Sequence, residues 1–232
     1  MIFGGIQKNS LIDFPGKISC VLFVSGCNFE CPYCHNPDLV RGNISPTPGL
    51  DENAVCDFLE MRKGLLDGVV ISGGEPTLQG DIIAFCEKLK EMGYPVKLDT
   101  NGTRPQVIGK LIDKGLVDYI AMDIKTDPFH YSPVITKIYS PADILKSIQI
   151  IMESMETYEF RTTCVKPIVD ANVIGGIGRI IEGAMLYVLQ GFQKTRLLRP
   201  EFFEEKGSGY DTNGLIRLRS AAEQWVNKCI IR

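Results

Sequence analysis

Short apolar runs alternate with longer amphipathic stretches along most of the chain. Runs such as 18–24 and 158–164 are rich in β-branched and aromatic residues and are typical of buried strands. The stretches between them carry apolar residues at helical spacing. The pattern predicts strands at 18–24, 68–72, 95–98, 117–122, 158–164 and 185–189, and helices at 51–63, 81–92, 105–114, 141–155, 173–183 and 212–229.

Local residues support several of these boundaries. Asp51 is a good N-cap, Gly93 is typical of the position just after a helix, and Pro141 suits a first helical turn. Glycines lower the helix propensity of 173–183. We expect a turn at the end of 1–16, a connector at 41–50, irregular structure at 126–140 and a loop at 191–211.

Six strands alternating with six helices predict an α/β fold. Such alternation is typical of parallel strands joined by right-handed crossovers. Six units are too few for the eight-unit closed barrel, so we expect an open partial (β/α)6 barrel with its mouth at the C-terminal strand ends. The 232 residues suit a single domain spanning 1–232, with a C-terminal loop and helix at 191–232.

Three cysteines gather in the loop 25–36 after the first predicted strand. Cys27, Cys31 and Cys34 have C-x3-C-x2-C spacing. Buried core cysteines are a poor explanation for three thiols on a polar loop. Structural zinc needs a fourth ligand, and His35 directly follows Cys34, which is poor geometry for one tetrahedral ion. A [4Fe–4S] cluster with one iron left open is the third interpretation. The spacing alone establishes only a three-thiolate site.

Composition narrows the classes of protein. The formal net charge of −3 disfavours a nucleic-acid-binding protein. We expect no membrane span, because no apolar stretch reaches about 18 residues, and the start lacks the features of a signal peptide. The chain has eight cysteines, and we expect a reducing cytoplasm rather than a disulfide framework. The remaining cysteines, which are scattered, are interpreted as core residues.

Further candidate residues follow the predicted strands. In parallel α/β folds the C-terminal strand ends share one rim, where active sites gather. Glycines allow close backbone approach to a ligand, and carboxylates at adjacent strand ends require positive charge nearby. An arginine fork within a strand matches a carboxylate. The candidates are Gly73, Gly74, Glu75, Asp99, Asp123, Lys125, Arg161 and Gln190.

The loop CNFECPYCHN resembles the cluster loop of the radical S-adenosylmethionine superfamily, with an aromatic residue before the last cysteine. Its Cys-His-Asn ending resembles the glycyl-radical-enzyme activating enzymes, as do Asp99-Thr100-Asn101-Gly102 and Asp123-Ile124-Lys125. Asp13-Phe14-Pro15-Gly16 resembles the entry segment of pyruvate formate-lyase activators, although it also suits a plain turn.

The resemblance implies that Cys27, Cys31 and Cys34 hold a [4Fe–4S] cluster whose open iron binds S-adenosylmethionine. It implies a cofactor-binding set in which GGEP meets the amino group, Arg161 the carboxylate, and Gln190 the adenosine. Tyr33 is expected along the adenine, since aromatic faces stack on bases. A monovalent cation near Asp99 and Asp123 is a further implication. The whole implied set is Tyr33, His35, Gly73, Gly74, Glu75, Asp99, Asp123, Lys125, Arg161 and Gln190.

The resemblance also implies an oxidoreductase that installs a glycyl radical on a partner enzyme, with anaerobic ribonucleoside-triphosphate reductase as the expected partner. The electron donor would be a flavodoxin or ferredoxin. Aromatic residues in 191–211 are expected either at a partner-facing lip or packed under the loop. One alternative is a small-molecule enzyme such as a 7-carboxy-7-deazaguanine synthase. Another is a non-catalytic zinc-binding interaction protein.

Overall fold

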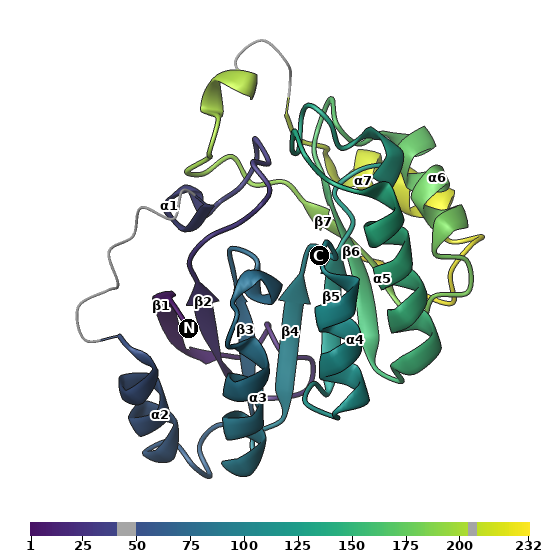
Figure 1. Cartoon of the computed structure of the whole chain (residues 1–232). Coiled ribbons are helices and arrows are strands. Elements are labelled where there is room, and N and C mark those ends of the chain that lie inside the picture. Colours follow the sequence, from purple (N-terminus) through teal and green to yellow (C-terminus); the bar gives the residue numbers. More distant parts are fainter. Residues whose placement is uncertain (41–49, 204–207) are drawn as a thin grey trace. The chain divides into compact units, whose positions relative to one another are not determined.

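The computed structural model describes residues 1–40, 50–203 and 208–232 (Figure 1). Most of the connector expected at 41–50, and part of the loop expected at 191–211, lie outside these residues. The chain forms two compact units. The first comprises Met1–Asn28, Asp38–Thr100 and Gln106–Ile120, and the second comprises Phe29–Pro37, Asn101–Pro105 and Ala121–Arg232. The prediction of a single domain over 1–232 stays a prediction.

The first unit is built on parallel strands with one antiparallel edge. Strand β1 pairs with β2 antiparallel, and β2, β3 and β4 pair in parallel. Both faces of β2 and β3 are largely buried, which explains their nearly continuous apolar sequence. The elements are β1 Phe3–Ser10, β2 Ser19–Val24, α1 Pro37–Val40, α2 Glu52–Glu60, β3 Gly68–Gly73, the 3-10 helix η1 Pro76–Leu78, α3 Ile82–Glu91, β4 Val96–Thr100 and α4 Pro105–Asp113.

Helix α2 begins where its N-cap residue predicts. The Asp51 carboxylate caps α2 by accepting a hydrogen bond from Ala54 N at 2.8 Å. Helix α3 buries Ile82, Phe85, Cys86 and Leu89 and packs on β4. These apolar faces form the core of the unit against the strands.

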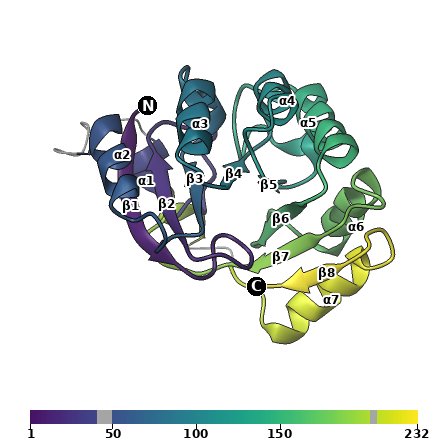
Figure 2. The same cartoon turned by 90° about the horizontal axis from the view of Figure 1, so that it is seen from below.

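Strand β5, Tyr119–Asp123, begins in the first unit and ends in the second. In the second unit β6, β7 and β8 pair in parallel, and helices α6 and α7 pack side by side (Figure 2). Its further elements are the 3-10 helix η2 Pro128–His130, α5 Pro141–Ser154, β6 Tyr158–Cys164, α6 Ala171–Ile180, β7 Tyr187–Gly191, the 3-10 helix η3 Pro200–Phe203, α7 Thr212–Ala222 and β8 Cys229–Ile231.

Gly178 of α6 allows this helix to lie close to Trp225, which follows α7 in the chain. A Cβ at Gly178 would lie 2.6 Å from Trp225 Cδ1. A larger residue would therefore push the indole ring away.

The alternation of six strands and six helices is confirmed by β2 to β7 and the helices that follow them. Two further strands were not predicted. The sequence of β1 shows little alternation of apolar and polar residues, because the middle of this edge strand is exposed. The helix predicted over 212–229 is wrong at its end: α7 stops at Ala222, and Cys229 begins β8, which gains hydrogen bonds along β7.

Candidate active site

In the first unit, the glycine pair Gly73-Gly74 at the end of β3 lies directly against the start of the cysteine loop. Gly74 N donates to Val24 O at 2.8 Å, and Glu75 N donates to Gly26 O at 2.8 Å. Gly73 has a φ of +109°, and a Cβ on Gly74 would overlap the Gly26 carbonyl. The two glycines are therefore required for backbone to meet backbone at this point.

Glu75 is only 1% exposed, and its carboxylate is held inside the first unit. Oε1 accepts hydrogen bonds from Thr77 N at 3.1 Å, from the Thr77 hydroxyl, and from Thr100 Oγ1 at 2.7 Å. The side chain thus caps η1 and ties it to the end of β4. The GGEP stretch presents backbone, while Glu75 stabilises its turn.

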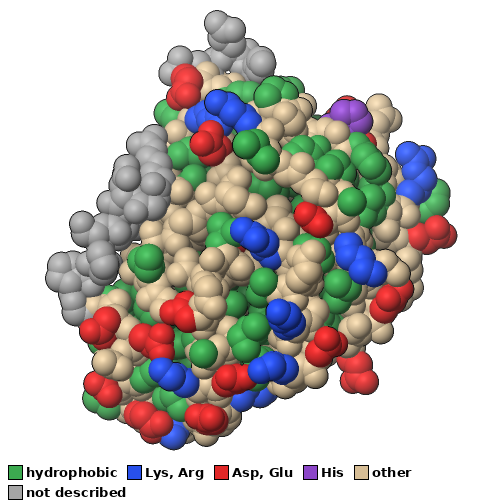
Figure 3. All heavy atoms as spheres, in the orientation of Figure 1, with side chains coloured by type: hydrophobic (Ala, Val, Ile, Leu, Met, Phe, Trp, Pro, Cys, Tyr) green, Lys and Arg blue, Asp and Glu red, His purple; other side chains and the backbone are tan. Residues whose placement is uncertain are grey.

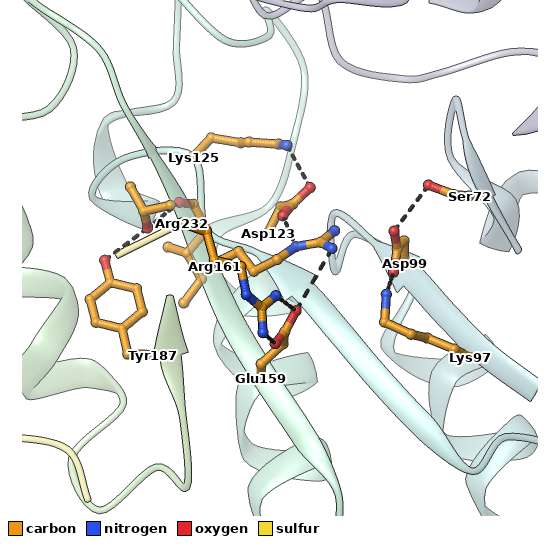
Figure 4. Close-up of polar contacts among 11 residues, drawn as sticks. Ser72, Lys97, Asp99, Asp123, Lys125, Glu159, Arg161, Tyr187 and Arg232 are labelled. Atoms are coloured by element: carbon orange, nitrogen blue, oxygen red, sulfur yellow. Dashed lines mark hydrogen bonds and ion pairs between the residues drawn. The ribbon is translucent and has the colours of Figure 1, made fainter. Parts of the chain in front are cut away.

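Asp99 lies near the end of β4, where Lys97 and Ser72 of its own unit contact it (Figure 4). Its carboxylate forms an ion pair with Lys97 Nζ and accepts from Ser72 Oγ at 3.1 Å. The Lys97 side chain is 2% exposed. Lys97 therefore supplies positive charge that the sequence analysis expected from elsewhere.

In the second unit, the cysteine loop from Phe29 onward is held by backbone contacts. Cys34 N donates to Cys31 O at 3.0 Å, which forms a tight turn between the two thiols. Leu198 N donates to Cys34 O at 3.1 Å, and Arg199 N donates to Pro32 O at 3.1 Å. The segment around 198–199 therefore braces the turn that carries Cys31 and Cys34.

Lys125 contacts two tyrosines, and one of them, Tyr33, belongs to this turn. Tyr33 Oη contacts Lys125 O at 3.5 Å, and Lys125 N donates to Tyr131 Oη at 3.0 Å. Burial raises the pKa of the Cys31 thiol to about 11 and also raises the pKa of Cys34, while the Lys125 ammonium lowers both. Tyr33 is 4% exposed, so its ring is packed within the unit.

Asp123 lies between two cations of the second unit (Figure 4). Lys125 Nζ is 2.9 Å from Oδ2, and Arg161 Nε is 2.7 Å from Oδ1. Burial alone would raise the pKa of the Asp123 carboxyl, but Arg161 and Lys125 outweigh burial and hold the pKa well below its usual range. The Asp123 carboxylate in turn raises the pKa of Lys125 despite the burial of this ammonium. The three groups are charged together at neutral pH.

His35 and Gln190 are the remaining candidates of the second unit. His35 is exposed, with Nε2 2.8 Å from Gln193 O and its ring stacked on Phe192. Gln190 is half-buried near the end of β7. Phe203 is buried and contacts Phe192 and Phe202. The described aromatics of 191–211 thus pack largely against their own unit and the cysteine loop.

The donor chemistry of the cysteine loop fits an iron–sulfur cluster. All three cysteines are free, and the Lys125 ammonium offsets part of the rise in pKa that burial causes at Cys31 and Cys34. Ser25 Oγ, two residues before Cys27, is buried and has no hydrogen-bond partner among the described residues. Its hydroxyl could therefore donate a hydrogen bond to a group bound at the cysteine loop. Within the described ranges, no three His, Cys, Asp or Glu side chains are arranged as a preformed metal site. Cys27 belongs to the first unit, and Cys31 and Cys34 belong to the second.

Sequence reasoning missed four residues that hold the candidates in place. They are Ser72, Lys97, Tyr131 and Glu159. Lys97 and Glu159 had one recognisable signal, since each is a charged residue inside a strand of buried neighbours. Ser72 and Tyr131 had no such signal in the sequence. The partner of Ser72 is 27 residues away, and Tyr131 lies in a segment expected to be irregular.

Comparison with known proteins adds to this geometry. Residues 21–171 match the family model described as the radical SAM superfamily. A protein of Methanocaldococcus jannaschii, whose name assigns it provisionally to the glycyl-radical enzyme activating enzymes, is 34% identical over 100% of this chain and 95% of its own length. A 7-carboxy-7-deazaguanine synthase of Methanothermobacter thermautotrophicus is 29% identical over 78% of this chain and 74% of its own.

A solved structure supports the fold. A radical SAM methyltransferase from Sphaerobacter thermophilus matches with a TM-score of 0.68 at 14% identity, covering 94% of this chain and 67% of its own. The likeness confirms the predicted α/β fold class, the partial barrel of such enzymes. In the described part of the chain, every helix is too short or too polar to cross a bilayer.

Proposed function

Because this chain belongs to the radical SAM superfamily, we propose that it is an oxidoreductase that installs a glycyl radical on a partner enzyme. Membership of the superfamily implies a [4Fe–4S] cluster and S-adenosylmethionine. The observation that carries the proposal is the turn of Cys31 and Cys34 attached through Tyr33 to Lys125, within a chain similar over its whole length to a relative assigned to activating enzymes.

Cys27, Cys31 and Cys34 would hold the cluster through their thiolates. A cluster bound there would supply the electron that cleaves S-adenosylmethionine into methionine and a 5′-deoxyadenosyl radical, which takes the Cα hydrogen of a glycine. The Lys125 ammonium would offset part of the burial effect that raises the pKa of Cys31 and Cys34.

The remaining residues would bind and orient the coenzyme. We assign the amino group to the backbone of Gly73 and Gly74, since Glu75 is committed to its own turn. Arg161 would meet the carboxylate, with its guanidinium held by Asp123. The remaining assignments rest on the family resemblance: Tyr33 beside the adenine, His35 and Gln190 near the adenosine, and Asp99 with Asp123 at a monovalent cation. Such a cation would compete with Lys97 and Lys125, which already neutralise the two carboxylates.

We further propose anaerobic ribonucleoside-triphosphate reductase as the partner, a flavodoxin or ferredoxin as the electron donor, and the cytoplasm as the compartment. Nucleic acid is not expected as a partner, and on the face drawn in Figure 3 acidic and basic side chains are interspersed.

The test is electron paramagnetic resonance of the anaerobically reconstituted protein, reduced and mixed with S-adenosylmethionine and the candidate reductase. We expect a glycine-centred doublet with the reductase and none with a reductase whose radical glycine is replaced by alanine. If S-adenosylmethionine is cleaved but no candidate glycyl-radical enzyme gives a doublet, the proposed partner class is wrong.

A second candidate function is synthesis of 7-carboxy-7-deazaguanine, favoured by the similarity to the synthase over 78% of this chain. Mass spectrometry of the small-molecule products would identify that compound. The zinc-binding alternative would give stoichiometric zinc and no broad visible absorbance after anaerobic reconstitution.

A further inference from the structure

Glu159 is a carboxylate buried inside the second unit. It is the second residue of β6, and its side chain is 1% exposed. A buried carboxylate is strongly destabilising unless cations and hydrogen bonds compensate its charge. The structure places two guanidinium groups beside it, from Arg161 and Arg232 (Figure 4).

The two guanidinium groups contact Glu159 differently. Arg232 binds it with both ends of its fork, Nη1 to Oε1 and Nη2 to Oε2, each at 2.9 Å. Arg161 Nη1 is 3.9 Å from Oε1. Arg232 therefore makes the bidentate hydrogen-bonded pair, whereas Arg161 is only an electrostatic neighbour.

Arg161 lies between two carboxylates on adjacent elements of the second unit. Its Nε donates to Asp123 at 2.7 Å, and Glu159 lies on the other side. Glu159 and Arg161 are two residues apart on β6, so their side chains share one face of the strand. If Glu159 lost Arg232, its charge would attract Arg161 away from Asp123.

The backbone holds Arg232 in place for this contact. Arg232 N donates to Leu189 O at 2.9 Å, and Gly191 N donates to Arg232 O at 2.8 Å, which continues the pairing of β8 with β7. The alternating series Arg232, Glu159, Arg161, Asp123 and Lys125 thus connects β8 with the turn that carries Cys31.

We propose that Glu159 and Arg232 are positioning residues for Arg161. By occupying both oxygens of Glu159, Arg232 keeps the Arg161 guanidinium directed at Asp123, where it is oriented for the carboxylate of S-adenosylmethionine. The inference rests on the proposed function, which assigns that carboxylate to Arg161.

The experiment measures the dissociation constant of S-adenosylmethionine by anaerobic calorimetry on cluster-loaded protein, together with iron content and melting temperature. Arg232→Gln should weaken binding by about tenfold at unchanged iron content. The double variant Glu159→Gln/Arg232→Gln should bind within about twofold of the parent, because a neutral amide no longer attracts Arg161. Arg232→Lys should fall between them, since an ammonium cannot form the fork.

Arg217→Gln is the matched control, because Arg217 is exposed on α7, and it should bind like the parent. Equal affinity of Arg232→Gln and the parent would overturn the inference. So would a double variant that binds as weakly as Arg232→Gln alone, since that result indicates a general structural role. Parent-like binding by Arg161→Gln would remove the assigned role of Arg161 and with it the inference. Failure of the proposed function is distinguishable, because the unaltered protein would then neither bind nor cleave S-adenosylmethionine.

Discussion

Arg161 on β6 donates from Nε to the Asp123 carboxylate at the end of β5, with 2.7 Å between the two atoms. Lys125 approaches the other oxygen of the same carboxylate at 2.9 Å. One carboxylate thus orients two cations that the sequence analysis assigned to coenzyme binding. This arrangement makes Asp123 a support for both.

Asp123→Asn should lower the free energy of unfolding by about 2 kcal/mol at pH 7.5. The pKa of Asp123 is held below its unfolded value of about 4, so its stabilisation is complete above that pH. The stabilisation is lost as the pH falls further toward the folded pKa. Urea unfolding of both proteins should give the same difference at pH 7.5 and 5.5, and a smaller one at pH 3.5.

The control is Asp113→Asn, an exposed position, which should leave stability nearly unchanged. A difference between parent and Asp123→Asn that already changes from pH 7.5 to 5.5 would contradict the prediction, because Asp123 does not titrate there.

Gly74→Ala should destabilise the protein by about 3 kcal/mol or more, because the new Cβ meets the Gly26 carbonyl and backbone has to move. Gly80→Ala is a matched control, since a Cβ there meets nothing within 4 Å. Thermal unfolding followed by circular dichroism compares the two. Equal melting temperatures would show that the β3 turn relaxes without cost.

Each of Cys27→Ala, Cys31→Ala and Cys34→Ala should abolish S-adenosylmethionine cleavage and lose most of the bound iron after reconstitution. Three thiolates are the smallest set that holds the cluster with one iron open. Cys56→Ala, on α2, is the control and should retain iron. Iron and sulfide analysis with product chromatography measures both effects. Full activity in any of the three loop variants would refute the ligand assignment.

Lys97→Met should cost about 3 kcal/mol of unfolding free energy, because it leaves the Asp99 carboxylate without its buried ammonium. Lys97→Met/Asp99→Asn should recover part of that loss, since a neutral amide at position 99 does not depend on the ammonium. Lys114→Met breaks the exposed pair with Glu87 and should cost less than about 0.5 kcal/mol. Denaturant titration measures the unfolding free energies of these three variants and of the parent. A double variant less stable than Lys97→Met would mean that Asp99 has other cationic support.

The placement of the candidates at strand ends was predictable from sequence. Apolar runs identify β2 and β6 because burial on both faces demands such runs, and the chemistry-bearing residues follow or end the strands. The GGEP glycines were also predictable, since a glycine pair after a strand indicates close backbone approach.

The partners of those candidates were not predictable. Glu159 and Arg232 are 73 residues apart, and Ser72 and Asp99 are 27 apart, so nothing local connects them. β8 was missed for a related reason: its three residues become a strand only through pairing with β7. The hydrogen bonds that Glu75 accepts from Thr77 and Thr100 were not predictable either, because Thr100 is 25 residues away on β4.

The hydrogen bond from Glu75 N to the Gly26 carbonyl has a consequence for protein engineering. A chimaera can take the cysteine loop from one relative and the GGEP turn from another. Its two backbone segments would then have to fit this close contact without having been selected together. We expect functional chimaeras only when both segments come from the same parent, so crossovers between Ser25 and Glu75 should be rare among active recombinants.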